Sequence, residues 1–467
     1  MGIPQTIKNI GVLFFARGIN IAGSVLIMAV VARYLSVEMY GKYSLVTDVV
    51  LMMIPLLKFG FSQILVREIA SDKAKAAKDV FTVMLLRAVI LLGGSLLAAA
   101  IMKGMTIDGD IKYALYLAII SEVLLAFMTL NTDVVIGFER MHYVTVLLTV
   151  NRTLMLAATI AVVYFDWGFY SLFISAIFVN LVSVTFGMWL MFRNYVLPRA
   201  SLDRMRIKFF LKESYIVAIA AFLMEVSFRM DSLFLAMEGY DEVALFGVPL
   251  KVISRLMMIT VVITEGTLPA ISRLAALSRG ELIIFLERTF KYINIILLPI
   301  CVMFTMFPGE IIGPLFGKKF LASAPSMQLL IWVLLFSSIV MFLCNVLIAV
   351  KKQGLTVFVI LPGIFINMAA DFMLIPHWGH AGASFGKVVS FAVMSLIAYF
   401  LVAREIGAFH IGASVLKQVF CTMLFAVAVW LTRDISEVFS LVSGGVFYGV
   451  SLFAAGALSF KELNGKL

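Results

Sequence analysis

The sequence predicts an all-α membrane protein that crosses the bilayer about fourteen times. Of the 467 residues, 63% are hydrophobic and 14% are charged, and the mean hydropathy is +1.07. A soluble domain carries about a quarter charged residues. Many apolar stretches here reach the ~20 residues that a transmembrane helix needs. Lipid offers the backbone no hydrogen-bond partners, so helices are the expected form of these stretches.

The predicted spans follow one another with short connections that leave no room for a soluble domain. The first span follows a short segment that contains only Lys8 and lacks a clear cleavage site, so we expect an uncleaved helix rather than a signal peptide. The spans cover residues 10–34, 43–66, 80–102, 112–135, 144–165, 171–193, 213–237, 243–271, 287–308, 326–350, 355–376, 382–403, 415–432 and 441–460.

Basic loop residues gather on one side of the predicted topology. The rule that basic loops stay in the cytoplasm then places both termini there. This distribution also accounts for much of the net charge of +10 without nucleic-acid binding. The longest basic connection, residues 193–212, mixes cations with Phe209, Phe210 and Leu211. It predicts an interfacial helix on the anionic inner leaflet, between two halves of the chain.

Short loop motifs suggest that these halves are repeats. Residues 39–41, 137–140 and 166–168 resemble residues 245–247, 349–352 and 377–379 at nearly constant spacing. With six helices in each copy, the two copies would be related by an axis along the membrane normal. We therefore predict lobes at 1–200 and at 201–404, the second including the basic linker, and a helix pair at 405–467.

Seven cations fall inside the predicted spans. A cation at membrane depth costs roughly 2.5–3.5 kcal/mol on insertion scales, and it is usually tolerated only where it faces protein, water or an anion. The set predicts an interior path for something anionic. At ~1.5 Å per residue, the first four lie roughly 10–12 Å below the cytoplasmic surface, and the last three lie from the midplane outward. They are Arg17, Lys58, Arg87, Arg152, Arg229, Lys251 and Arg255.

Structural explanations compete with this path. Arg229 has Glu225 one turn away and Asp231 nearby, so it could be neutralised on its own helix. Cations near span ends, Lys387 among them, are expected to snorkel to the surface. The acids within spans can be counter-ions, and Glu122 and Asp371 are the best candidates for proton or sodium coupling.

Other kinds of chemistry find little support in the sequence. The three cysteines are far apart in the chain, and His377 and His380 lack a third ligand, so no metal site is predicted. No nucleophile with a base and no nucleotide motif is present. The sequence therefore predicts neither an enzyme nor a cofactor, and an ion channel would lack a filter-like segment.

Three local motifs carry a family resemblance that extends over the whole chain. They are residues 32–35 with 40–44, residues 243–247, and residues 375–383. With them, the chain resembles the oligosaccharide/polysaccharide flippases, the O-antigen repeat-unit translocases of the multidrug/oligosaccharidyl-lipid/polysaccharide (MOP) exporter superfamily. The resemblance implies two six-helix lobes around a central cavity that opens alternately to either side, plus a C-terminal helix pair.

The resemblance also implies a cargo of undecaprenyl-pyrophosphate-linked oligosaccharide, moved from the inner to the outer leaflet of the cell's inner membrane. Membrane lipids are expected partners, together with a polysaccharide polymerase and a chain-length regulator. Two alternatives remain within the same superfamily. The cargo of drug exporters is often cationic. This chain departs from their usual pattern because it has Arg17, and not an acidic residue, deep in the first span. The cavity arginines of lipid II flippases cannot be matched here residue by residue.

Overall fold

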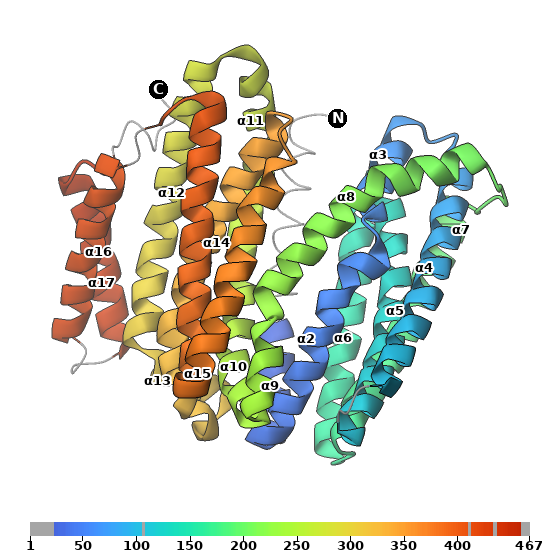
Figure 1. Ribbon diagram of the computed structural model, residues 1–467, viewed down its shortest axis with the longest axis horizontal. Helices are drawn as coiled ribbons and strands as arrows, with labels where there is room; N and C mark the ends of the chain where they lie inside the picture. Colours follow the sequence, from blue (N-terminus) through green and yellow to red (C-terminus); the bar gives the residue numbers. More distant parts are fainter. Residues whose placement is uncertain (1–22, 105–107, 410–411, 433–436, 459–467) are drawn as a thin grey trace. The chain divides into compact units, whose positions relative to one another are not determined.

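The computed structural model describes residues 23–104, 108–409, 412–432 and 437–458, and these are helical without any strand (Figure 1). Arg17 lies outside the described residues. Ten of the described helices are long and apolar enough to cross a membrane. The predicted all-α polytopic membrane fold is therefore confirmed.

The helices follow the chain in short succession. After the helix Gly23–Tyr34 they are α2 (Val37–Lys58), α3 (Phe61–Ser71), α4 (Ala76–Gly104), α5 (Gly109–Gly137), α6 (Met141–Tyr164), α7 (Phe169–Asn194), α8 (Arg204–Arg229), α9 (Asp231–Glu238), α10 (Tyr240–Leu256), α11 (Met258–Leu277), α12 (Arg279–Met306), α13 (Pro308–Phe316), the 3-10 helix η1 (Lys318–Ser323), α14 (Ala324–Ala349), α15 (Leu355–Ile406), α16 (Gly412–Thr432) and α17 (Glu437–Ala454).

Polar side chains fix where several helices begin. The Ser36 hydroxyl accepts the Met39 N–H at the start of α2. Asp203 does the same for the first turn of α8, and Ser278 for that of α12. Such caps satisfy backbone donors that have no partner within the helix.

The second predicted span is broken into α2 and α3. Pro55 lies one turn before the break, and Phe59 and Gly60 both adopt left-handed backbone angles, with φ of 53° and 67°. Only glycine takes such angles without strain. A Cβ on Gly60 would also lie 2.9 Å from the Ser214 carbonyl oxygen of α8. The break thus has two causes, a lost backbone donor and a close helix approach.

The eleventh and twelfth predicted spans are the two limbs of α15. Gly379, with φ of 50° and ψ of −133°, is the non-helical point between them. The limbs pack so closely that a Cβ on Gly386 would lie 2.8 Å from Cβ of Ala370. The expected loop is therefore reduced to a sharp kink.

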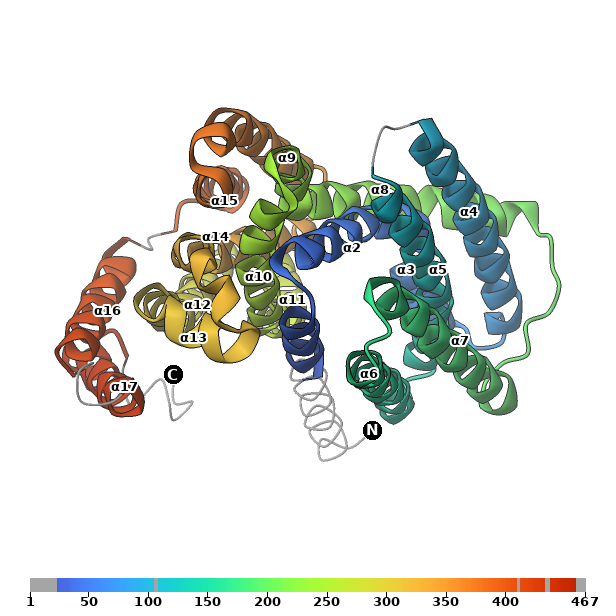
Figure 2. The ribbon, with the colours of Figure 1, turned by 90° about the horizontal axis from the view of Figure 1, so that it is seen from below.

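The chain forms two compact units, residues 1–244 and 245–467. In the first unit α5 is central and contacts α2, α3, α4, α6 and α7 (Figure 2). In the second unit α14 holds the corresponding position and contacts α11, α12, α13 and α15. These two helices are the fourth and tenth predicted spans, as a six-helix repeat requires. The lobe boundaries at residues 200 and 404 stay predictions.

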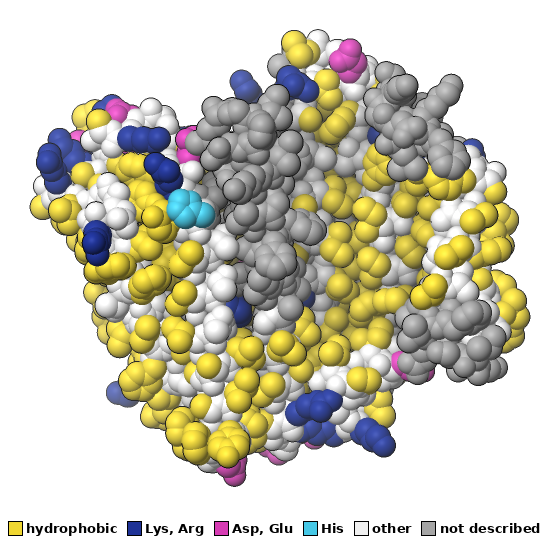
Figure 3. Space-filling model, turned by 180° about the vertical axis from the view of Figure 1, so that it is seen from behind, with side chains coloured by type: hydrophobic (Ala, Val, Ile, Leu, Met, Phe, Trp, Pro, Cys, Tyr) yellow, Lys and Arg dark blue, Asp and Glu magenta, His cyan; other side chains and the backbone are white. Residues whose placement is uncertain are grey.

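The surface fits a lipid environment. Hydrophobic side chains are widespread over the coloured part of the face shown in Figure 3, and Lys and Arg lie mainly toward its upper and lower edges. Leu92 and Leu96 of α4 and Phe178 of α7 are more than 60% exposed. Contiguous exposed apolar surface of this kind is typical of membrane helices, because lipid and not water surrounds it.

Candidate functional site

Arg87 lies at the centre of the first unit. It continues the buried stripe of α4 formed by Val80, Val83 and Leu91, and its side chain is fully buried. The guanidinium donates hydrogen bonds to the Ala126 carbonyl at 2.8 Å and to three further oxygens. These are Ser62 Oγ at 3.3 Å, Asp133 Oδ2 at 3.4 Å and Thr129 Oγ1 at 3.5 Å.

Asp133 of α5 balances the charge of Arg87. Its Oδ2 also accepts a 2.6 Å hydrogen bond from Ser62 Oγ. The pair and the hydroxyl therefore join α3, α4 and α5. A buried ion pair of this kind is stable only when the remaining donors and acceptors are also satisfied.

Lys58 and Glu122 are opposite charges in this region that interact electrostatically, without a direct ion pair between these two described residues. Lys58 is the last residue of α2, where a cation interacts favourably with the helix dipole. Glu122 of α5 is its dominant charged neighbour, and the Arg87–Asp133 pair also lies within electrostatic range. The Oε2 atom of Glu122 is buried and accepts no hydrogen bond from the described residues.

Arg152 of α6 has no such balance. It is partly buried, and neither an ion pair nor another charged group acts on it within the described residues. Its Nε atom is buried there without a hydrogen-bond acceptor. A Cβ on Gly23 would lie 2.9 Å from Arg152 Cγ, so the side chain packs against the first helix. Residues 1–22 contain no Asp or Glu that could neutralise it.

Arg229 is held in an ion-pair network within the first unit. Its guanidinium donates to Glu225 at 2.7 Å and to Asp48 at 2.8 Å, and Asp48 also accepts a hydrogen bond from Ser232 at 2.8 Å. The neutralisation considered from the sequence is thus present, with Asp48 of α2 as an additional partner. Arg229 groups with the first unit rather than with the second-half cations.

The remaining predicted residues lie in the second unit. Lys251 and Arg255 share one face of α10, where Lys251 is partly buried and Arg255 is exposed. Asp371 is fully buried in the first limb of α15, and its Oδ2 accepts a 3.1 Å hydrogen bond from Asn367.

Lys387 corrects one expectation. It was predicted to snorkel from a span end, but it is fully buried, and its Nζ lies 5.8 Å from the centre of the Phe246 ring. The kink at Gly379 lets the first limb of α15 cover this part of the second limb. The short distance of Lys387 from the end of its predicted span therefore led to the wrong prediction, an exposed side chain instead of a buried one.

A polar seam beside Arg152 was missed from the sequence. Asn151 of α6 donates to Asn180 and Ser183 of α7 at 3.1 and 3.0 Å. Asn180 in turn donates to the Ser121 hydroxyl of α5 at 3.0 Å, next to Glu122. Asparagine and serine carry no charge, so the pattern of charged residues within the spans does not reveal this seam, although asparagine inside an apolar span is itself a sign of interhelical hydrogen bonding.

The geometry thus gathers Lys58, Arg87, Glu122 and Asp133 in the first unit, with Arg152 on neighbouring α6. No group of three or more potential metal ligands occurs among the residues that the structure describes. Such a site can hold an anion or change its charge by protonation, and both are functions of membrane-embedded ionisable groups.

Comparisons with known proteins show a family and a fold for this chain. The family model described as "Polysaccharide biosynthesis protein" matches residues 6–274. An uncharacterised membrane protein of Methanocaldococcus jannaschii is 23% identical over 181 residues, which are 38% of this chain and only 35% of that protein. The fold is similar to that of the lipid II flippase MurJ in an inward closed conformation, with a TM-score of 0.77, 13% identity, and coverage of 95% of this chain and 98% of that chain. A multidrug resistance MATE family transporter of the MOP superfamily, in an inward-facing conformation, gives a TM-score of 0.68 at 14% identity over 82% of this chain and 93% of its own.

Proposed function

The chain belongs to the polysaccharide biosynthesis protein family, and from this and its fold we propose that it is a flippase of the MOP superfamily for undecaprenyl-pyrophosphate-linked oligosaccharide repeat units. It would carry them from the cytoplasmic to the outer leaflet of the inner membrane by alternating access. The lipid tail would stay in the bilayer while the charged head passes through the protein.

The observation that carries this proposal is Arg152. A cation within a membrane span without a neutralising carboxylate is stabilised by an anion. A guanidinium binds phosphate oxygens in a two-pronged geometry that a single charge cannot reproduce. The pyrophosphate of the cargo would therefore supply the counter-charge that the described residues lack.

The other cations take graded roles in this proposal. Lys58 and Arg152, with Arg17, would contact the pyrophosphate first. Arg87 would act from its place beside Asp133, adding to the local field. Arg229, Lys251 and Arg255 would act at a later stage, and Arg229 would exchange a carboxylate partner for the phosphate.

Glu122 and Asp371 are the proposed coupling sites for a proton or sodium gradient. Protonation of Glu122 would remove the negative charge beside Lys58 and strengthen the attraction of that region for an anion. Deprotonation would favour release. Both termini would be cytoplasmic. Membrane lipids, a polysaccharide polymerase and a chain-length regulator would be the partners.

The test is transport by the reconstituted full-length protein. Liposomes would contain fluorescent undecaprenyl-pyrophosphate oligosaccharide, and a membrane-impermeant quencher would report its exposure. A hydrogen bond to a charged group is worth about 1.5–3 kcal/mol, so we expect Arg152→Gln to slow transport on the order of 10- to 100-fold. Arg152→Lys should recover only part of the rate.

The matched control is Arg193→Gln, because Arg193 is exposed at the end of α7 and stacks only on Trp189 among the described residues. It should transport normally. Transport by Arg152→Gln at the wild-type rate would refute the role of Arg152. Transport of a cationic dye or of lipid II, in place of the oligosaccharide, would refute the cargo.

A further inference from the structure

The outer face of the first three turns of α8 combines a basic stripe with an apolar stripe. Arg204, Lys208 and Lys212 recur every four residues and are exposed. Residues so spaced lie above one another on a helix. The adjacent stripe is formed by Ile207, Leu211 and Tyr215, which are spaced in the same way.

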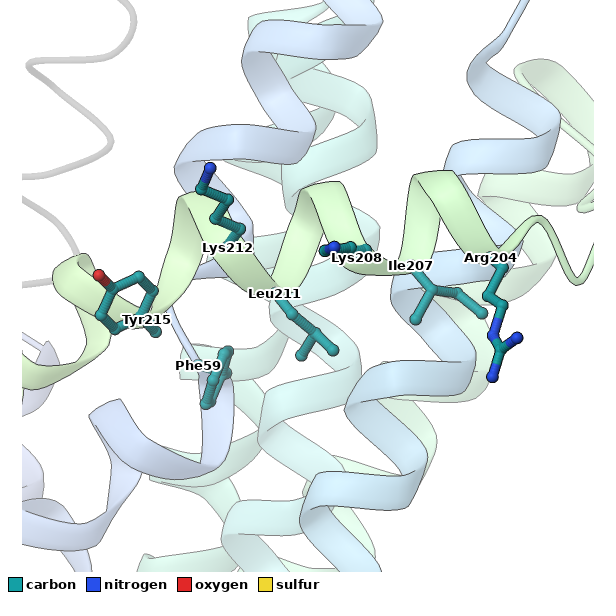
Figure 4. Close-up of a pocket in the computed structure, with 7 residues that line it drawn as sticks. All are labelled: Phe59, Arg204, Ile207, Lys208, Leu211, Lys212 and Tyr215. Carbon is teal, nitrogen blue, oxygen red and sulfur yellow. The ribbon is translucent and has the colours of Figure 1, made fainter.

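These six residues and Phe59 line a surface groove of about 730 Å³ (Figure 4). Phe59 comes from the α2–α3 break, where its left-handed backbone brings the ring beside α8. Leu211 projects toward the Phe59 side of the helix in Figure 4. The groove therefore has charged groups beside a continuous apolar wall.

The opposite face of the same turns anchors α8 to the protein. Arg206 binds Asp79 through Nε at 2.8 Å and through a second nitrogen, and it binds Glu68 at 3.2 Å. Phe210 is fully buried against α3 and α4. With its inner face fixed in this way, α8 presents the groove outward without needing a ligand to order it.

The charges of the groove are not neutralised by any acidic side chain in the part of the chain that the structure describes. Arg204, Lys208 and Lys212 form no ion pair with any described residue. Next to them, Leu202 and Met205 are 76% and 82% exposed. Apolar side chains this exposed beside lysine and arginine are typical of a helix embedded in the headgroup layer of a membrane.

We propose that this groove binds one anionic phospholipid, with its negatively charged headgroup beside the basic stripe of Arg204, Lys208 and Lys212 and an acyl chain along Ile207, Leu211, Tyr215 and Phe59. The basic stripe selects a negative headgroup. The apolar wall selects a lipid over a soluble phosphate. Its three cations are different from those of the proposed cargo path, although Phe59 directly follows Lys58 in the chain, and the ligand proposed for it is a structural lipid rather than cargo.

The test is a lipid titration of the purified full-length protein by native mass spectrometry. Dioleoylphosphatidylglycerol is compared with dioleoylphosphatidylcholine. We expect one phosphatidylglycerol to bind preferentially. The triple variant Arg204→Gln, Lys208→Gln, Lys212→Gln should lose on the order of 100-fold in that preference, about fivefold for each charge removed near the surface. Helix content by circular dichroism should be unchanged because all three side chains are exposed.

The matched control removes the same charge elsewhere in the first unit. Lys73→Gln, Lys78→Gln, Arg199→Gln neutralises three exposed cations that do not line the groove, and it should change the preference far less than the groove variant does. If the two triple variants lost equal preference for phosphatidylglycerol, the lipid would be attracted by the general positive charge of the protein, and the proposed site would be overturned. Competition by inorganic phosphate, or full lipid binding by Leu211→Asn, would overturn the acyl-chain contact. Cargo transport in phosphatidylcholine liposomes should be the same for both triple variants, so this proposal can fail independently of the flippase.

Discussion

Removing one partner of the Arg87–Asp133 pair is expected to destabilise the protein more than removing both. Breaking a buried pair costs about 3–5 kcal/mol, because one charge is left without its partner. The lower end applies here, since Ser62 still donates to Asp133 and the Ala126 carbonyl still accepts from Arg87. We expect about 3 kcal/mol for Arg87→Leu or for Asp133→Leu, which is roughly a 150-fold fall in the ratio of folded to unfolded protein.

The double variant Arg87→Leu, Asp133→Leu buries no charge. Replacing a buried pair by apolar residues is often neutral or stabilising. We expect its free energy of unfolding to be at least about 3 kcal/mol above the value that the single variants would give by addition. The assay is reversible unfolding in mixed micelles titrated with sodium dodecyl sulfate, followed by circular dichroism.

An exposed ion pair provides the control. Lys352 and Glu405 are 3.1 Å apart, and 53% and 23% of their side chains are exposed, so the pair is screened by solvent and Lys352→Ala should change the free energy by less than about 1 kcal/mol. Additive effects of the Arg87 and Asp133 variants would refute the pairing. A transport assay of the double variant distinguishes a structural role of Arg87 from a role in transport. A stable double variant that still transports would make Arg87 purely structural, whereas a stable one that does not would place its charge in the cargo path.

Two further predictions concern close packing and the anchoring of α8. In Gly41→Ala the new Cβ would lie 1.8 Å from the Tyr240 backbone oxygen, so we expect a loss of about 3 kcal/mol in unfolding free energy. Gly93→Ala, with open space around it, should instead raise stability by about 0.5 kcal/mol, and equal stabilities would contradict the close approach. Arg206→Lys cannot keep both nitrogens on Asp79 and should cost about 1.5–3 kcal/mol in the same titration, while an unchanged midpoint would show that the two-pronged contact is unimportant.

The sequence predicted the helical membrane fold because length and apolar character are local properties. It also placed Arg87 and Asp133 within spans. It did not show that they touch, because their partnership depends on which faces of α4 and α5 meet. The prediction that Lys387 snorkels to the surface was wrong for a related reason. The depth of Lys387 was judged along one span, whereas its burial comes from tertiary packing in the second unit, where it lies over Phe246 of α10.

The break after Lys58 shows a second limit. Pro55 and Gly60 were visible in the sequence, but proline is common in membrane helices and does not always end one. The left-handed angles at Phe59 and Gly60 arise together with the approach of α8, which lies about 150 residues further along the chain. Contacts between residues so far apart in the sequence determine the backbone angles at this break, and a local sequence pattern cannot predict them.

The kink at Gly379 has a consequence for biogenesis. The limbs of α15 are joined without a loop, so they can enter the bilayer during synthesis as one hairpin. Asp371 and Lys387 lie on opposite limbs, and both are fully buried. Inserted singly, each limb would expose a charge to lipid at roughly 2.5–3.5 kcal/mol. As a hairpin, each limb covers part of the other, so the partitioning penalty falls before the rest of the second unit has been made.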